Sequence, residues 1–143
     1  MLQTGLGALF GVPHRANRSA AWLVRSMNNS LQYDESTRVL FERELTLTAS
    51  SGDILRPVKI AIYEALPIGG DWIVWFEIRG LLSPSSIYRF NGVQVDPLGA
   101  FITALHHLAL NLMTSVAYRT GHLFWLEPGD QCGLPLPKGY ENL

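Results

Sequence analysis

The chain has little cysteine and little charge. Cys132 is the single cysteine among 143 residues, so no disulfide can form within the chain and no cysteine-rich zinc site can be built. Charged residues make up 16% and the formal net charge is −1, which argues against the clustered Lys and Arg that neutralise nucleic-acid phosphates. We therefore expect no nucleic-acid partner. A chain without disulfides also fits a reducing compartment, and we expect a cytoplasmic protein.

Apolar residues, by contrast, make up 48% of the chain. This content is too high for intrinsic disorder, and 143 residues are enough for one domain with a real core. No P-loop, GxGxxG, GxSxG or HExxH pattern occurs. The sequence thus indicates a globular domain, declares no chemistry, and gives no reason to expect a cofactor or a bound metal.

Acidic residues are missing from the start of the chain. Residues 1–33 contain three arginines and no acid. Three interpretations compete for this segment: an organellar transit peptide, a weaker secretory signal, and a translation start at Met27 that makes the upstream part dispensable. We favour the third, and we divide the chain into an N-terminal extension, residues 1–37, and one domain, residues 38–143. A chain beginning at Met27 is then expected to fold, because exposed termini are usually expendable.

Alternation of apolar and polar residues predicts an antiparallel sheet. Val39, Phe41, Leu45 and Leu47 fall on one face of the first strand, with Arg43 as a misfit on that face. The same period of two, or a short apolar run, predicts strands at residues 39–48, 58–66, 71–79, 87–90 and 122–127. Glycine-rich turns join them, so the strands form a meander.

The stretch from Pro97 to Thr120 predicts one long helix. Asp96 suits the N-cap, Pro97 the first helical position and Gly121 the position after the last turn. The large apolar side chains cover an arc of roughly 140°, while polar side chains gather on the other side, which excludes a membrane span. We expect an α+β fold: an antiparallel sheet of four or five strands with one long amphipathic helix packed on one face.

Two adjacent histidines, His106 and His107, lie within this helix. Adjacent helical residues point ~100° apart and cannot converge on one ion, whereas histidine ligands on a helix are three or four residues apart. His107 lies opposite the apolar arc, where we expect it to be solvated, and His106 lies at the edge of the arc. We interpret both as structural residues.

Other candidate chemistry is sparse. Glu42 and Glu44 share one strand face as candidate paired carboxylates, but a solvated sheet face explains them better. Cys132 lies among loop formers without a base nearby to activate it. The alternative function is an enzyme or a small-ligand binder with a pocket near the Gly/Pro-rich C-terminal segment, which would unite His122, Asp130 and Cys132.

Short motifs mark three parts of the chain. They are Gly70-Asp71-Trp72, then Phe90-Asn91-Gly92-Val93 followed by Asp96, and finally Trp125-Leu126, Gly129-Asp130, Gly133 and Pro135. With these motifs the chain resembles a family of short, uncharacterised bacterial proteins that carry a G-D-W strand, a G-V-D helix start and a W-L…G-D…G…P tail. The resemblance covers about residues 39–137, with Gln94 and Val95 inserted before Asp96. It implies a bacterial source and supplies no catalytic residues.

The strand at residues 71–79 presents candidate binding residues. If the helix covers one side of it, then Trp75, Glu77 and Arg79 face away, near Tyr63. Trp, Tyr and Arg are the residue types of interface hot spots. We therefore expect a small protein-binding module that acts stoichiometrically, with an immunity protein that neutralises a toxin as the specific candidate. Alternatively, residues 1–37 fold back over this face, or a second copy of the chain covers it in a homodimer.

Overall fold

The computed structural model describes residues 33–140. The chain divides into two compact units, residues 1–35 and 36–143, and the expected start at Met27 lies outside the described residues. The second unit holds the described elements, which are β1 (Val39–Thr48), β2 (Ile54–Tyr63), β3 (Leu66–Ile68), β4 (Asp71–Arg79), β5 (Ile87–Gln94), α2 (Pro97–Met113), α3 (Val116–Arg119), β6 (Leu123–Phe124) and the 3-10 helix η1 (Gln131–Gly133).

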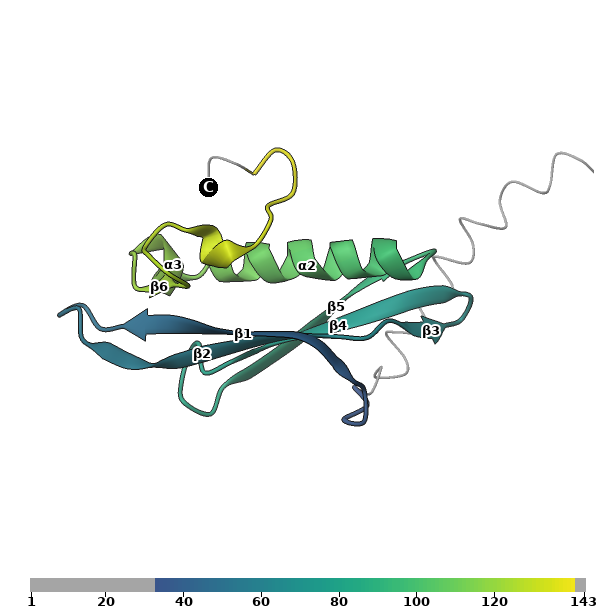
Figure 1. Ribbon diagram of the computed structural model, residues 1–143, viewed down its shortest axis with the longest axis horizontal. Helices are drawn as coiled ribbons and strands as arrows, with labels where there is room; N and C mark the ends of the chain where they lie inside the picture. Colours follow the sequence, from purple (N-terminus) through teal and green to yellow (C-terminus); the bar gives the residue numbers. More distant parts are fainter. Residues whose placement is uncertain (1–32, 141–143) are drawn as a thin grey trace, which may run out of the picture. The chain divides into compact units, whose positions relative to one another are not determined.

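The six strands form one antiparallel sheet. β5 pairs along one edge of β4, while β2 and β3 share its other edge; β1 then pairs with β2, and β6 with β1. Figure 1 shows α2 along one face of this sheet, with α3 and the yellow C-terminal segment on the same side. The predicted α+β fold is confirmed. The sheet has one strand more than expected because β3 forms where a turn was predicted.

The core lies between the sheet and α2. Alternate side chains of β1, β2 and β4 meet the helix, and the most buried of them are Leu45, Val58, Ile60, Ile62, Val74, Phe76 and Ile78. On α2 the matching residues include Ala100, Ala104, Leu108 and Leu112. The two alanines in the first half of α2 allow a close approach to β5. This alternation confirms which face of β4 the helix covers.

The predicted single helix to Thr120 is two helices. α2 ends at Met113 because Ser115 adopts an extended conformation, and its hydroxyl accepts a hydrogen bond from the Tyr118 amide as the N-cap of α3. Serine favours such a cap over a helix interior because its side chain competes for backbone groups. The expected terminator Gly121 does follow α3, with φ +78°. Within the described part of the chain, no helix is long and apolar enough to span a bilayer.

His107 does not point into solvent as expected. It is half-buried, its Nδ1 lies 3.0 Å from the carbonyl oxygen of Asn91, and its ring centroid lies 5.7 Å from that of Phe90. The expectation was wrong because Ala100 and Ala104 continue the buried line of Leu108 and Leu112, whereas Leu98 and Ile102 of the expected apolar arc are exposed. This rotation brings His107 down onto β5, where it covers an outward-pointing carbonyl at the edge of the sheet.

Candidate functional site

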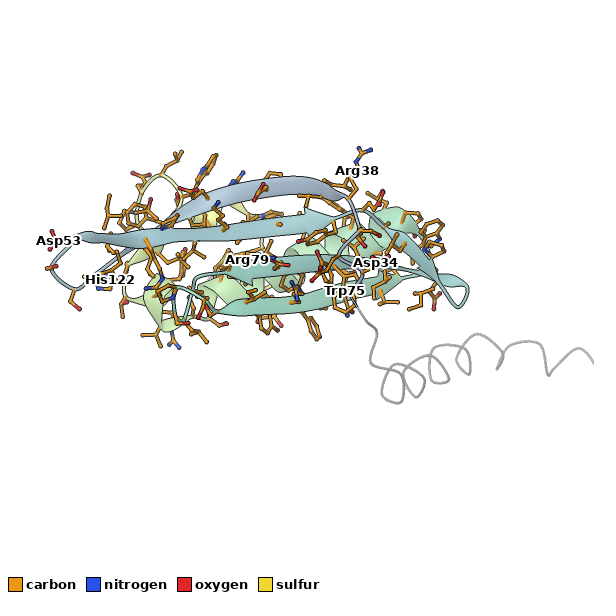
Figure 2. The ribbon with its side chains drawn as sticks, turned by 90° about the horizontal axis from the view of Figure 1, so that it is seen from below. Asp34, Arg38, Asp53, Trp75, Arg79 and His122 are labelled. Carbon is orange, nitrogen blue, oxygen red and sulfur yellow. The ribbon has the colours of Figure 1, made fainter. Side chains whose placement is uncertain are left out.

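Two rows of side chains cross the face of the sheet that α2 leaves open, here called the outer face. Figure 2 looks onto this face, with Trp75 and Arg79 labelled on β4. The strand register sets the rows: one runs Glu42, Ala61, Glu77, Arg89, and the next runs Glu44, Lys59, Arg79, Ile87. Residues in one row are cross-strand neighbours and lie close enough to interact.

The small side chain of Ala61 leaves a hollow among its larger neighbours. The hollow over Ala61 has a volume of about 290 Å³, and its lining residues are Val39, Glu42, Lys59, Ala61, Tyr63, Glu77 and Arg79. Val39 was expected on the opposite face with Phe41. A register shift between these two residues, opposite the end of β2, turns Val39 to the outer face beside Tyr63. The bulge therefore supplies one wall of the hollow.

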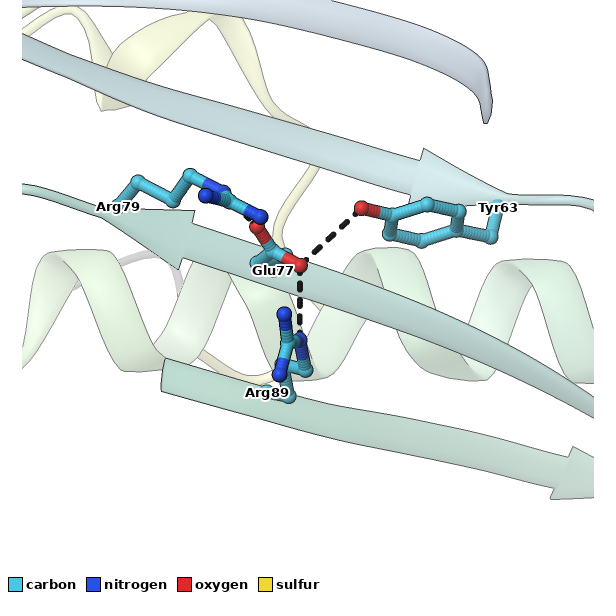
Figure 3. Close-up of polar contacts among 4 residues, drawn as sticks. All are labelled: Tyr63, Glu77, Arg79 and Arg89. Atoms are coloured by element: carbon cyan, nitrogen blue, oxygen red, sulfur yellow. Dashed lines mark hydrogen bonds and ion pairs between the residues drawn. The ribbon is translucent and has the colours of Figure 1, made fainter. Parts of the chain in front are cut away.

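The carboxylate of Glu77 is the most tightly held group beside the hollow. Its side chain is only 2% exposed. Arg89 donates from Nε to Glu77 Oε2 at 2.8 Å, the Tyr63 hydroxyl donates to the same oxygen at 3.1 Å, and Arg79 donates from Nε to Oε1. Figure 3 shows the three donors converging from β2, β4 and β5. Oε2 is thus engaged by groups from the two neighbouring strands, and Oε1 by Arg79 of the same strand.

These contacts decide the charge of Glu77. Burial by itself would raise its pKa, but hydrogen bonds from Arg89, Arg79 and Tyr63, together with the positive charge of Arg79, outweigh burial and hold the pKa below its ordinary value. The carboxylate is therefore ionised at neutral pH. A group held in this way is a poor proton donor, so we interpret Glu77 as a residue that fixes the positions of its neighbours.

The structure brings three of the four predicted binding residues into contact. Tyr63, Glu77 and Arg79 form one hydrogen-bonded cluster, and Trp75 lies on the same face, half-buried. The expected exposure was wrong for two of them: Tyr63 is 5% and Glu77 is 1% exposed. They support the surface instead of supplying contact area, because charged and phenolic groups this deep need hydrogen-bonding partners.

Sequence reasoning did not identify the hollow. Ala61 is inconspicuous within an alternating strand, and Arg89 belongs to β5, whose register against β4 was not predicted. The signal that would have found them is the register of three neighbouring strands, which places the smallest side chain between Glu42 and Glu77. Glu44, which was weighed as a carboxylate partner of Glu42 and interpreted as part of a solvated face, lies in the other row and does not line the hollow.

The three residues of the alternative site in the C-terminal segment each make structural contacts. The carboxylate of Asp130 accepts hydrogen bonds from the backbone amides of Leu126 at 2.7 Å and Cys132 at 2.9 Å, among others. Burial raises the pKa of the Cys132 thiol to about 12, helped by the charge of Asp130 and opposed by that of Arg43. A buried, protonated thiol is not a nucleophile. The third group, His122, contacts the hydroxyl of Thr48 through Nδ1 at 3.1 Å.

Arg43 holds the C-terminal segment against β1. Arg43, the one charged residue on the inner face of β1, donates hydrogen bonds from Nη1 to the carbonyl oxygens of Cys132 and Gly133, at 2.8 and 3.0 Å. Its guanidinium also lies 3.8 Å from the Trp125 ring centroid. Gly133 has φ +65°, and a Cβ there would lie 2.5 Å from Arg43 Nη1. The tail motif is therefore structural. Among residues 33–140, no group of three potential metal ligands gathers.

The match to a known family covers most of this architecture. A family model described as a domain of unknown function, DUF6968, matches residues 41–136. The chain belongs to the DUF6968 family. The matched region runs from β1 through the closed C-terminal segment, and it includes Ala61, Glu77 and Arg89. No curated protein and no solved structure matches the chain. The family of unknown function expected from the motifs is confirmed.

Proposed function

We propose that this DUF6968 protein binds another protein stoichiometrically through the outer face, with the hollow over Ala61 at the centre of the contact. The hollow itself is the observation that carries the proposal, because it is a recess in the sheet face lined by apolar, aromatic and charged side chains together. A preformed recess can take a protruding side chain of the partner without first being ordered, and such filled pockets supply much of the affinity of interfaces.

Each predicted binding residue has a role in this proposal. Arg79, with a side chain 51% exposed, and Trp75 are the members that reach the partner. Tyr63 and Glu77 lie beneath the surface and hold Arg79 in position through the hydrogen bonds of the cluster. Arginine and tryptophan around a recess are typical of interface hot spots.

The size of the hollow favours a protein over a small-molecule ligand. At about 290 Å³ it lies at the lower end of small-molecule pockets, so it admits one or two side chains and does not enclose a cofactor. Stoichiometric binding of this kind is what an immunity protein does to its toxin, and we propose that role as the specific case. The C-terminal alternative gains no support, because Cys132 is buried and Asp130 is bound by backbone amides.

Filling the hollow tests the proposal. We expect Ala61→Trp to weaken partner binding at least about thirtyfold, the factor that corresponds to the loss of a ~2 kcal/mol hot spot. The measurement is affinity isolation from the organism that encodes the chain, with every recovered protein quantified for the wild type and the variants. Val116→Trp is the matched control, because it adds the same side chain at a position that is 77% exposed on α3, on the far side of the sheet.

One result supports the proposal: a protein recovered in equimolar amount with the wild type and with Val116→Trp, and lost with Ala61→Trp. Melting temperatures of all three proteins show whether each is folded. Equal recovery with a folded Ala61→Trp protein would place the contact elsewhere and overturn the proposal.

A further inference from the structure

We infer that β1 binds an extended basic segment of another protein, which adds to the sheet as one more antiparallel strand beside Glu42 and Glu44. The segment carries a basic, an apolar and a basic residue in succession. This inference goes beyond the proposed function, because it concerns the edge of the sheet and does not depend on the hollow over Ala61. β1 is the bluish strand at the upper border of the sheet in Figure 2.

The edge of β1 is open because β6 is short. β6 pairs with β1 over two residues. The amide of Leu126 would continue this ladder beside Glu44, but it donates to the carboxylate of Asp130 at 2.7 Å, as the neighbouring amide of Trp125 does at 3.2 Å. Asp130 therefore bends the chain away from β1 and leaves the first half of that strand without a neighbour on this side among residues 33–140.

The backbone groups of Glu42 and Glu44 point to the open edge. Successive residues of a strand direct their N–H and C=O groups to opposite sides. The amide of Thr48 donates to the carbonyl oxygen of His122, on the β6 side, at 2.8 Å, so Glu44 and Glu42 point the same way. Within the described part of the chain, no hydrogen bond engages these two N–H and two C=O groups. Such a row is a template for an added strand.

The side chains of the same two residues give the edge its charge. Glu42 and Glu44 are exposed, and neither carboxylate makes an ion pair or a hydrogen bond with any described residue, including Lys59 on β2. Arg43, between them, is held on the inner face by two carbonyl oxygens, and Arg38 lies beyond the bulge at the start of β1. Basic side chains of an added strand would lie directly opposite the two carboxylates, where opposite charges stabilise pairing.

The middle residue of the added segment lies on the other face of the sheet, opposite Arg43. The guanidinium of Arg43 is flanked there by two rings, with its carbon 5.0 Å from the centroid of Phe41 and 3.8 Å from that of Trp125. Because side chains alternate between the faces of a strand, a basic residue on each side of this position brings an apolar one to the rings.

The same charges disfavour a second copy of this chain as the added strand. Two copies paired through this edge would place Glu42 of each opposite Glu44 of the other, and like charges at such positions are destabilising. The other edges of the sheet are protected in different ways: His107 lies against the carbonyl oxygen of Asn91 on β5, and β3 contains Pro67. The edge of β1 thus selects a basic strand over its own sequence.

Amide hydrogen exchange of the full chain tests the inference. In the free protein, we expect the amides of Glu42 and Glu44 to exchange fast, and those of Arg43 and Leu45, which point to β2, to exchange slowly. A capped peptide in which Lys alternates with Val is then added at millimolar concentration. The exchange of the Glu42 and Glu44 amides should slow at least about tenfold, because the peptide backbone now accepts their hydrogen bonds.

Three comparisons separate strand addition from charge attraction. Methylating the backbone nitrogens of the Lys residues, which would face β1, should abolish binding, whereas methylating those of the Val residues should not. Replacing Glu42 and Glu44 together by Gln should weaken binding at least about threefold. Glu127→Gln, at an exposed position in the C-terminal segment, is the matched control and should leave the affinity unchanged. Melting temperatures show that each variant is folded.

The contradicting results are equally specific. Slow exchange of Glu42 and Glu44 in the free chain would show that the edge is already covered, and it would overturn the inference. Failure of the Lys–Val peptide to protect these amides, or equal protection by a peptide of alternating Glu and Val, would also overturn it. None of these results bears on the hollow, which Ala61→Trp tests separately with the partner itself.

Discussion

At the scale of single residues, the outer face depends on one buried carboxylate. Glu77 is 1% exposed, yet its three donors come from three different strands, so it ties β2, β4 and β5 together beneath the surface. Ala61 has the opposite role, because its small size creates the space that its neighbours surround. Glu77, which forms part of the wall, and Ala61, which leaves the space, are therefore neighbours in one row of the sheet.

Replacing Glu77 tests this dependence. Glu77→Gln should lower the free energy of unfolding at pH 7 by about 1–3 kcal/mol, because a neutral amide loses the charge-assisted hydrogen bonds to Arg79 and Arg89. Chemical denaturation of both proteins measures the difference. Glu44→Gln is the matched control on the same face, where an exposed glutamate outside any ion pair among the described residues should change stability little.

The effect of Glu77 should also depend on pH. Its folded pKa lies below its ordinary value of 4.5, so the unfolded chain takes up the proton first as the pH falls. The stabilisation is complete well above pH 4.5 and is lost as the pH drops below that value through the folded pKa. Wild type and Glu77→Gln should therefore converge in stability at low pH. A constant difference from pH 7 to pH 3 would show that the pKa of Glu77 is the same in the folded and the unfolded chain.

At the scale of elements, the position of α2 depends on Gly92. A Cβ at this position of β5 would lie 2.3 Å from the backbone nitrogen of Ala104 and 2.7 Å from the carbonyl oxygen of Ala100. Backbone atoms of a helix cannot move individually out of the way, so any larger residue must push the whole of α2 off the sheet. The glycine of the Phe90-Asn91-Gly92-Val93 motif is thus required by packing.

We expect Gly92→Ala to destabilise the protein by about 1–3 kcal/mol or more, through overpacking against α2. Urea denaturation measures the loss. Gly52→Ala is the comparison: it has φ +88° but no atom within 4 Å of its Cβ, so its cost is limited to backbone strain of about 1–2 kcal/mol. If Gly92→Ala proved as stable as the wild type, α2 would not lie on β5 as described.

Several elements could be predicted from the sequence because their causes are local. Asp96 caps α2 through the amide of Gly99, as its position before Pro97 indicated. The break at Ser115 was missed because apolar periodicity continues past it. The half-burial of His107 was missed because the buried line of α2 includes Ala100 and Ala104, while the larger Leu98 and Ile102 are exposed. The hollow needs the register of three strands and a bulge after Val39, which no single stretch of sequence contains.

At the scale of the whole unit, residues 36–140 have two faces with different roles. α2 covers one face of the sheet, and the C-terminal segment lies against α2 in turn, held by Arg43. The buried Cys132 and Leu134 belong to this closed layer. The other face carries the hollow over Ala61. Family membership adds no activity, so the role of the chain depends on whether this outer face is the protein-docking site that we propose.

The methyl group of Ala61 reports occupancy of the hollow most directly. The full chain is labelled with ¹³C at its alanine methyl groups, and its spectrum is followed as the isolated partner is added. We predict that the Ala61 resonance shifts and that the change is complete at one equivalent, while the resonance of Ala104, which is fully buried on the sheet-facing side of α2, stays in place. Binding that leaves the Ala61 resonance unchanged would contradict docking at the hollow.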